Sequence, residues 1–101
     1  MKIMERLIQK VDRSQWAKKI AIEKRYEPVE ARLGFPPSRR YRAYIGSQDT
    51  NTRVIVRDWS SLQAFLVTIE KAMADPEHQA LGAEQVGLVL SNQVELYIIE
   101  S

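Results

Sequence analysis

The chain has 101 residues, of which 45% are hydrophobic and 28% charged, and its 15 basic and 13 acidic side chains leave a net charge of +2. This length predicts one globular domain over residues 1–101, because a second core would have too little apolar surface to bury. The small net charge argues against general attraction to nucleic acid, and the absence of cysteine excludes disulfides and thiolate metal sites. No signal peptide or membrane-length apolar run is visible, so we expect a cytoplasmic protein.

The first third of the chain predicts a strand and then a helix. Residues 1–11 mix apolar and charged side chains with a period of two, which is typical of a strand. Residues 16–33 carry apolar side chains at helical spacing. We expect Pro28 to kink or divide this helix, because it removes a backbone donor. Gly34 is then expected to end the helix.

The middle of the chain predicts a hairpin followed by a second helix. Residues 39–46 and 53–59 read as strands, and the polar sequence "SQDTNT" between them has turn chemistry. Ser60 and Gln63 have the spacing of a capping box, so Ser60 is expected to cap the helix that follows. The apolar face expected for that helix consists of Leu62, Phe65, Leu66, Ile69, Ala72 and Met73.

The last third predicts a helix restart and a final strand. Within "ADPEHQAL", Asp75 can cap a new helical segment and Pro76 suits its first position. The final strand is "NQVELYIIE", residues 92–100. The resulting β-α-β-β-α-β order predicts an α+β fold, a ferredoxin-like antiparallel four-stranded sheet with both helical regions on one face.

The strands sort their side chains onto two faces, because successive residues of a strand point to opposite sides. The set expected beneath the helices is Ile3, Leu7, Tyr41, Ala43, Ile45, Val54, Val56, Val94, Leu96 and Ile98. The set expected on the second face is Met4, Arg6, Ile8, Arg40, Arg42, Tyr44, Ile55, Arg57, Trp59, Glu95, Tyr97 and Ile99. Too many members of this second set are large and apolar for a face turned to water. We therefore expect a partner subunit or a ligand to cover it.

Residues 53–81, with "RVIVRDWSSLQAF" and then "MADPEHQAL", resemble the dimeric α+β barrel superfamily, which includes antibiotic-biosynthesis monooxygenase-like and NIPSNAP-like proteins. The order of elements along nearly the whole chain is similar to theirs as well. The resemblance implies a homodimer in which two sheets pack face to face, which would cover the second face. It implies no single activity, because these families include cofactor-free oxygenases, isomerases, distant haem-binding branches and members without known activity.

Three arginines of the second face, Arg6, Arg42 and Arg57, share it with Glu95 and Tyr97. Guanidinium groups can hold a carboxylate or phosphate of a ligand, because their paired N–H donors match an anion. They can equally form ion pairs across a dimer interface, where arginine is enriched. We favour the interface for these five residues, because interface pairing also explains their apolar neighbours.

Three aromatic residues assigned to the same face, Tyr44, Trp59 and Tyr97, can stack on a ligand or fill the space between two sheets. If a small molecule binds, we expect it to contact these three residues and Arg57. Such a molecule would be aromatic or otherwise planar, with an anionic or carbonyl group beside Arg57.

His78 is the only histidine, and we favour a packing or surface role for it over catalysis. It lacks companions with metal-ligand spacing, so we expect neither a metal nor a cofactor. The sequence therefore leaves open a ligand-binding or interaction homodimer and a cofactor-free monooxygenase or isomerase without identifiable catalytic residues. An RNA-binding ferredoxin-like module is a weaker alternative, since "TRVIVRDW" lacks the glycines and aromatics of that motif.

Overall fold

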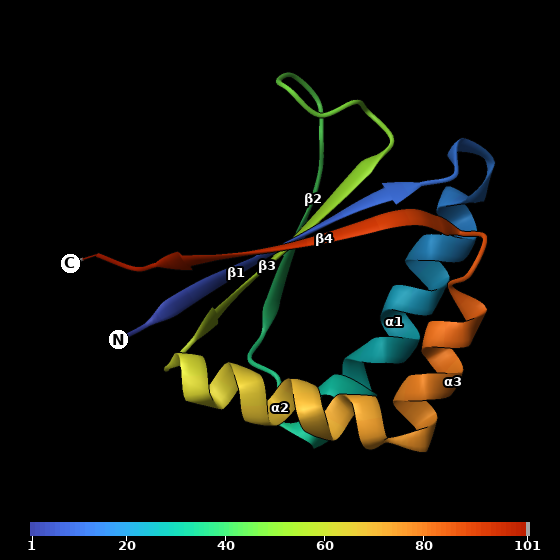
Figure 1. Ribbon diagram of the computed structural model, residues 1–101. Coiled ribbons are helices and arrows are strands. Elements are labelled where there is room, and N and C mark those ends of the chain that lie inside the picture. Colours follow the sequence, from blue (N-terminus) through green and yellow to red (C-terminus); the bar gives the residue numbers. More distant parts are fainter. Residues whose placement is uncertain (101) are drawn as a thin grey trace.

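The computed structural model describes residues 1–100, and its four strands form one antiparallel sheet in the order β2-β3-β1-β4. All the α-helices lie on one side of this sheet (Figure 1). The elements in chain order are β1 (Ile3–Val11), a short 3-10 turn (Arg13–Gln15), α1 (Trp16–Leu33), β2 (Ser38–Arg42), β3 (Thr52–Trp59), α2 (Leu62–Ala74), α3 (Pro76–Glu84) and β4 (Val89–Ile98). The predicted ferredoxin-like α+β fold is thus confirmed. No helix within residues 1–100 is long and apolar enough to cross a membrane.

The pairing of β1 with β3 shows which face of the sheet the helices cover. Ile3 pairs with Trp59 and Leu7 with Ile55, and directly paired residues point to the same face. Ile55, Arg57 and Trp59 therefore lie beneath the helices, and their assignment to the second face was wrong by one position. The uncovered face, called the open face below, takes the valines of β3 instead: Val54 and Val56.

Strand β2 shows the same shift of one position. Arg40 pairs with Ile55 and Arg42 pairs with Arg53, so both arginines lie on the helix-covered face and Tyr41 lies on the open face. The predicted assignment of β2 was therefore wrong as well. Strand β2 also ends earlier than predicted, which leaves Ala43, Tyr44 and Ile45 in the connection to β3.

The ends of α1 follow the local sequence. Gly34 has a φ of +94° and its backbone N–H donates to the carbonyl oxygens of Ala31 and Glu30, which confirms it as the end of the helix. The helix runs without interruption across Pro28, so the expected division did not occur. Val29, the next residue, is buried in one cluster with Ile22, so packing of α1 continues past the backbone hydrogen bond that proline removes.

Helix α2 is capped by Ser61, not by Ser60 as the capping-box spacing predicted. The Ser61 hydroxyl oxygen accepts a hydrogen bond from the Ala64 backbone N–H at 3.0 Å. The next helix agrees with the prediction: Asp75 accepts from the His78 backbone N–H at 3.0 Å, and Pro76 begins α3.

We expect Ser61→Ala to lower the free energy of unfolding by about 1 kcal/mol, because an N-terminal backbone donor loses its partner. The matched control is Ser60→Ala, which removes the neighbouring hydroxyl but leaves the cap. Chemical denaturation of both variants checks this expectation. Equal losses for the two serines would contradict the assignment of the cap.

The helices cover the sheet incompletely. Trp59, Ile3 and Phe65 form a buried cluster under α2, and Ile22, Val29 and Leu81 form another between α1 and α3. The other part of the predicted apolar face of α2 stays exposed, namely Leu62, Leu66 and Met73. This loose cover leaves room between the sheet and the helices.

Candidate functional site

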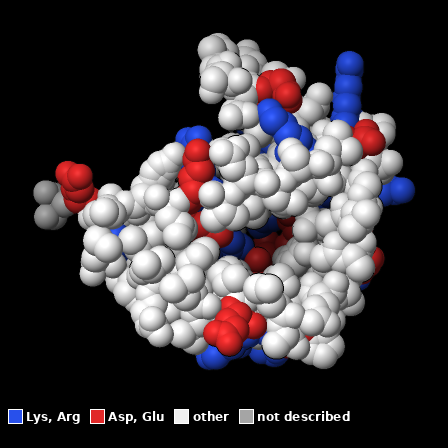
Figure 2. All heavy atoms as spheres, viewed as in Figure 1, with Lys and Arg blue, Asp and Glu red and all other residues white. Residues whose placement is uncertain are grey.

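A cavity of about 270 Å³ lies between the helix-covered face of the sheet and the helices. All four strands and helices α1, α2 and α3 contribute to its lining. Figure 2 shows its mouth as a hollow near the centre of the molecule, with acidic and basic atoms at the bottom. The cavity is thus a concave site with a charged floor.

Arg57 is the charged group at one end of the cavity, and it is only 5% exposed. Its Nη2 lies 2.7 Å from Glu30 Oε2, and its Nη1 lies 3.6 Å from Glu5 Oε1. The guanidinium carbon lies 5.0 Å from the centre of the Phe35 ring, and the Nε atom has no hydrogen-bond partner within the described residues. Two carboxylates and one aromatic ring therefore hold Arg57 in place while donor capacity remains.

A second charged cluster surrounds Glu23 of α1. Arg53 donates to its two carboxylate oxygens at 2.8 and 3.0 Å, and Lys19 and Arg40 each lie 3.6 Å from it. Lys19 is buried, and its Nζ donates to Gln85 at 2.7 Å. Burial lowers the pKa of Lys19, and the nearby Glu23 carboxylate opposes that shift. Each of these charges is therefore paired.

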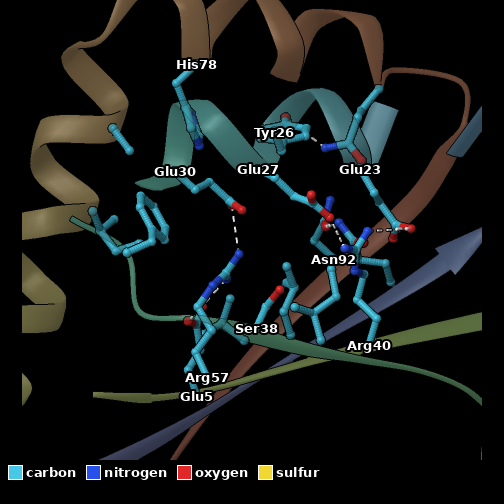
Figure 3. A pocket seen from close by; sticks show the side chains of 18 of the residues that line it. Glu5, Glu23, Tyr26, Glu27, Glu30, Ser38, Arg40, Arg57, His78 and Asn92 are labelled. Carbon is cyan, nitrogen blue, oxygen red and sulfur yellow. Dashed lines mark hydrogen bonds and ion pairs between the residues drawn. The ribbon is translucent and has the colours of Figure 1, made fainter. Parts of the chain in front are cut away.

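Aromatic groups line the cavity near Arg57. The His78 ring lies nearly parallel to that of Phe35, with centres 6.1 Å apart, and meets the Tyr26 ring edge-on at 5.4 Å. Figure 3 shows His78 pointing from α3 into the cavity, toward the side of Glu30. Burial raises the pKa of Tyr26, and its hydroxyl accepts a hydrogen bond from Gln85 Nε2 at 2.9 Å. The histidine for which we predicted a packing or surface role is thus part of the cavity wall.

The four residues predicted to bind a ligand are not brought together. Arg57 lines the cavity, whereas Trp59 is buried beside it and donates from Nε1 to Glu5 at 3.0 Å. Tyr44 is 84% exposed in the connection between β2 and β3, and Tyr97 lies on the open face. Their joint role as one ligand site has no support from this arrangement.

The five residues predicted for a dimer interface divide between the two faces. Arg6, Glu95 and Tyr97 share the open face, where Glu95 lies 3.0 Å from Arg6 and accepts from the Tyr97 hydroxyl at 2.7 Å. Arg42 and Arg57 lie on the helix-covered face, with Arg42 stacked on the Trp16 ring at 4.0 Å. The prediction that all five share one face was wrong, because it inherited the one-position shift of β2 and β3.

Sequence reasoning missed the acidic residues of the cavity. A signal for them exists: Lys19, Glu23 and Glu30 recur at helical spacing on the side of α1 that also carries Ile22 and Val29. Charged residues at core positions of a helix are seldom buried unless they are paired. Within residues 1–100, no cluster of acidic, histidine or cysteine side chains is suited to hold a metal ion.

Comparison with known proteins finds relatives by structure only. No protein-family model matches the chain, and no curated protein matches it by sequence. A NIPSNAP family protein from Agrobacterium tumefaciens superposes with a TM-score of 0.84 at 16% identity, covering 98% of this chain and 86% of that one. A NIPSNAP-like domain protein from Burkholderia xenovorans gives 0.82 at 17% identity, covering 99% and 86%.

A third similar structure is SnoaB, a cofactor-independent oxygenase from Streptomyces nogalater. It superposes with a TM-score of 0.72 at 17% identity, covering 99% of this chain and 94% of SnoaB. Likeness at such identities concerns the fold and leaves the activity open. The protein therefore has the ferredoxin-like α+β fold of NIPSNAP family proteins and of the oxygenase SnoaB, as its sequence resemblance predicts.

Proposed function

We propose that the protein is a homodimer that binds a small planar organic molecule in the cavity between sheet and helices. The observation that carries this proposal is the cavity itself, which combines aromatic walls with the buried guanidinium of Arg57. Ligand sites usually pair apolar walls with a few placed polar groups, and their volumes start at about 300 Å³. A cytoplasmic location belongs to the proposal, because a chain without cysteine needs no oxidising compartment.

The charges of the cavity favour a neutral ligand. Four glutamates line it against three basic side chains, and each basic group already faces a carboxylate. A third anion beside Arg57 would meet the carboxylates of Glu30 and Glu5, and a buried unpaired charge is costly. A carbonyl oxygen can take a free N–H of Arg57 without that cost. The ligand class is therefore an uncharged ring compound with a carbonyl group.

Titration with 2-acetonaphthone, a neutral ketone, and 2-naphthoate, its anionic analogue, tests this function by ligand-observed NMR. We expect the ketone to bind more tightly than the anion. Val94→Trp should abolish binding, because Val94 lines the cavity on β4 and is 53% exposed, so a large side chain can fill the space there. Val86→Trp is the matched control on an exposed site outside this cavity. Unchanged ketone binding by Val94→Trp would place the ligand elsewhere.

The observation that supports the proposed homodimer is the open face of the sheet. No helix lies on this face, which carries Met4, Ile8, Val54, Val56 and Tyr97. Ile8 and Val56 are already buried within the chain, so the apolar surface still open to water belongs to Met4, Tyr41, Val54 and Tyr97. Two such faces packed around a two-fold axis would remove that surface from water.

We expect a dimer in sedimentation experiments at micromolar concentration. Val54→Glu should shift the protein toward monomer, because it places a charge in the proposed interface. Val67→Glu, on the exposed side of α2, is the matched control and should remain dimeric. A parent protein that sediments as a monomer would contradict the proposed assembly.

A second candidate function is cofactor-free oxygenation, which the likeness to SnoaB favours. Here the bound ligand itself would supply the electrons for oxygen. Oxygen uptake with an easily oxidised hydroxynaphthalene, compared between the parent and Val94→Trp, distinguishes this candidate from binding alone. Equal uptake by both proteins would count against it.

A further inference from the structure

Among the described titratable side chains that line the cavity, His78 is the one without a hydrogen bond or ion pair. Glu30 and Glu5 are bound to Arg57, and Glu5 also accepts from Trp59. Within residues 1–100, the His78 imidazole takes part in no side-chain hydrogen bond or ion pair, and its ring points into the cavity (Figure 3).

The remaining titratable groups of the cavity lining each have a hydrogen-bond or ion-pair partner, as Glu5 and Glu30 do. Glu23 and Glu27 are paired with arginines, Lys19 donates to Gln85, and the Tyr26 hydroxyl accepts from Gln85. A carboxylate that is bound to a guanidinium would have to leave that partner before it could reach a ligand. Within the described residues, the nitrogens of His78 have no such partner, and general bases are most often histidines.

The Phe35 ring lies near both His78 and Arg57, which limits the distance between these two residues. The ring centres of His78 and Phe35 are 6.1 Å apart, and the guanidinium carbon of Arg57 lies 5.0 Å from the same Phe35 ring. His78 and Arg57 are therefore within about 11 Å of each other, since their separation cannot exceed these two distances added. This value is an upper limit, and a carbonyl group that lies between the two residues can direct its oxygen at Arg57 and the carbon beside it at His78.

The backbone of His78 is held independently of this chemistry. Its N–H donates to Asp75, and Arg32 donates to both carboxylate oxygens of Asp75 at 2.9 Å. These bonds fix the first turn of α3, and the imidazole lies between the rings of Tyr26 and Phe35. The charges that surround His78 are those of Glu30 and Arg57 inside the cavity, and of Asp75, Glu77 and Arg32 at the helix start.

We propose that His78 is a catalytic base that removes a proton from the carbon beside a ligand carbonyl, with Arg57 holding the oxygen. This inference rests on the proposed ligand site. The C–H bond breaks and its proton goes to the imidazole nitrogen. The released electron pair forms a carbon–carbon double bond, and the carbonyl π pair moves onto the oxygen, where a guanidinium N–H stabilises it. This negative charge forms together with the positive imidazolium, so the cavity gains no net charge, whereas binding of an anionic ligand would add one. The imidazolium then returns the proton to the same carbon or to another carbon of the conjugated system, so no oxidant or reductant is consumed.

Deuterium exchange of 2-indanone in D2O tests the proposal, because this neutral two-ring ketone has acidic C–H bonds beside its carbonyl. We expect the full-length protein to accelerate exchange, measured by proton NMR in a buffer without imidazole. His78→Gln should slow the catalysed exchange by about 100-fold or more, which is the usual contribution of a general base. In His78→Ala, added imidazole should restore exchange, which a purely structural histidine would not allow.

The controls separate this inference from the proposed function. Ala80→Gln, at an exposed position of the same helix, should exchange like the parent. Thermal melts and 2-indanone binding are measured for every variant. Binding without catalysed exchange, or exchange that both His78 variants retain, overturns the role of His78 and leaves the ligand site standing. Absence of both binding and exchange overturns the two proposals together.

Discussion

Replacing Arg57 with methionine should lower the free energy of unfolding by about 3–5 kcal/mol, because it leaves buried carboxylates without their partner. Glu5 and Arg57 have side chains that are 5% and 6% exposed, and Glu30 is 19% exposed. Water can therefore replace the guanidinium only in part. Denaturation with urea, monitored by circular dichroism, measures the loss.

Two further variants identify the cause of this loss. Arg57→Met combined with Glu30→Gln should recover part of the stability, because one of the stranded charges is removed. Arg40→Met is the matched control, since Arg40 also contacts glutamates but its side chain is 30% exposed, and such pairs contribute about 1 kcal/mol or less. Similar losses for Arg40→Met and Arg57→Met would contradict the burial argument. A loss of ligand binding in an Arg57 variant is informative only after its folding has been checked.

Replacing Trp59 with alanine should cost about 3–5 kcal/mol, as truncations of large buried aromatic residues do. Trp59 is 3% exposed and packs edge-on against Phe65 at 5.4 Å, with Phe35 at 5.7 Å on another side. Its Nε1–H also satisfies Glu5, so the alanine variant loses both packing and a buried hydrogen bond.

The variant Trp59→Phe separates these two contributions. It keeps an aromatic ring in the cluster and should lose about 1–3 kcal/mol, mainly for the unpaired Glu5 oxygen. Tyr44→Ala is the control for removal of an exposed aromatic, with an effect within about 0.5 kcal/mol. In thermal and chemical denaturation, the loss of stability should be largest for Trp59→Ala, intermediate for Trp59→Phe and smallest for Tyr44→Ala. A small effect of Trp59→Ala would mean that this residue lies outside the core.

The boundaries of the helices were predictable where a single residue type decides them. Gly34 can adopt a positive φ without a steric clash, so it can end a helix. Asp75 accepts a hydrogen bond from a free backbone N–H at the start of α3, and Pro76 suits the first helical position. Adjacent serines are a different case, because either hydroxyl can cap. Ser61 has extended backbone angles and its oxygen reaches Ala64, which the spacing of Ser60 and Gln63 did not reveal.

The faces of the sheet were predictable for β1 and β4 and not for β2 and β3. In β3, both alternations are apolar, since Val54 and Val56 compete with Ile55 and Trp59. A strand with two apolar faces has no preferred side by pattern alone, and a slip of one residue moves every side chain to the opposite face. Arg57 was assigned to the uncovered face, but its pairing with Glu5 allows both charged side chains to be buried.

The sequence by itself determined the order of strands and helices, the stops and starts at Gly34 and Asp75, and the ferredoxin-like topology, because these depend on local conformation and short-range periodicity. Only the tertiary structure decided that Arg57 faces Glu30 and that His78 points into the same cavity. Those residues come from β3, α1 and α3, and their meeting depends on strand register and helix docking. The spacing of neighbouring residues encodes neither strand register nor helix docking. Both are needed before a buried charge meets its partner, because the partner lies on a distant segment of the chain.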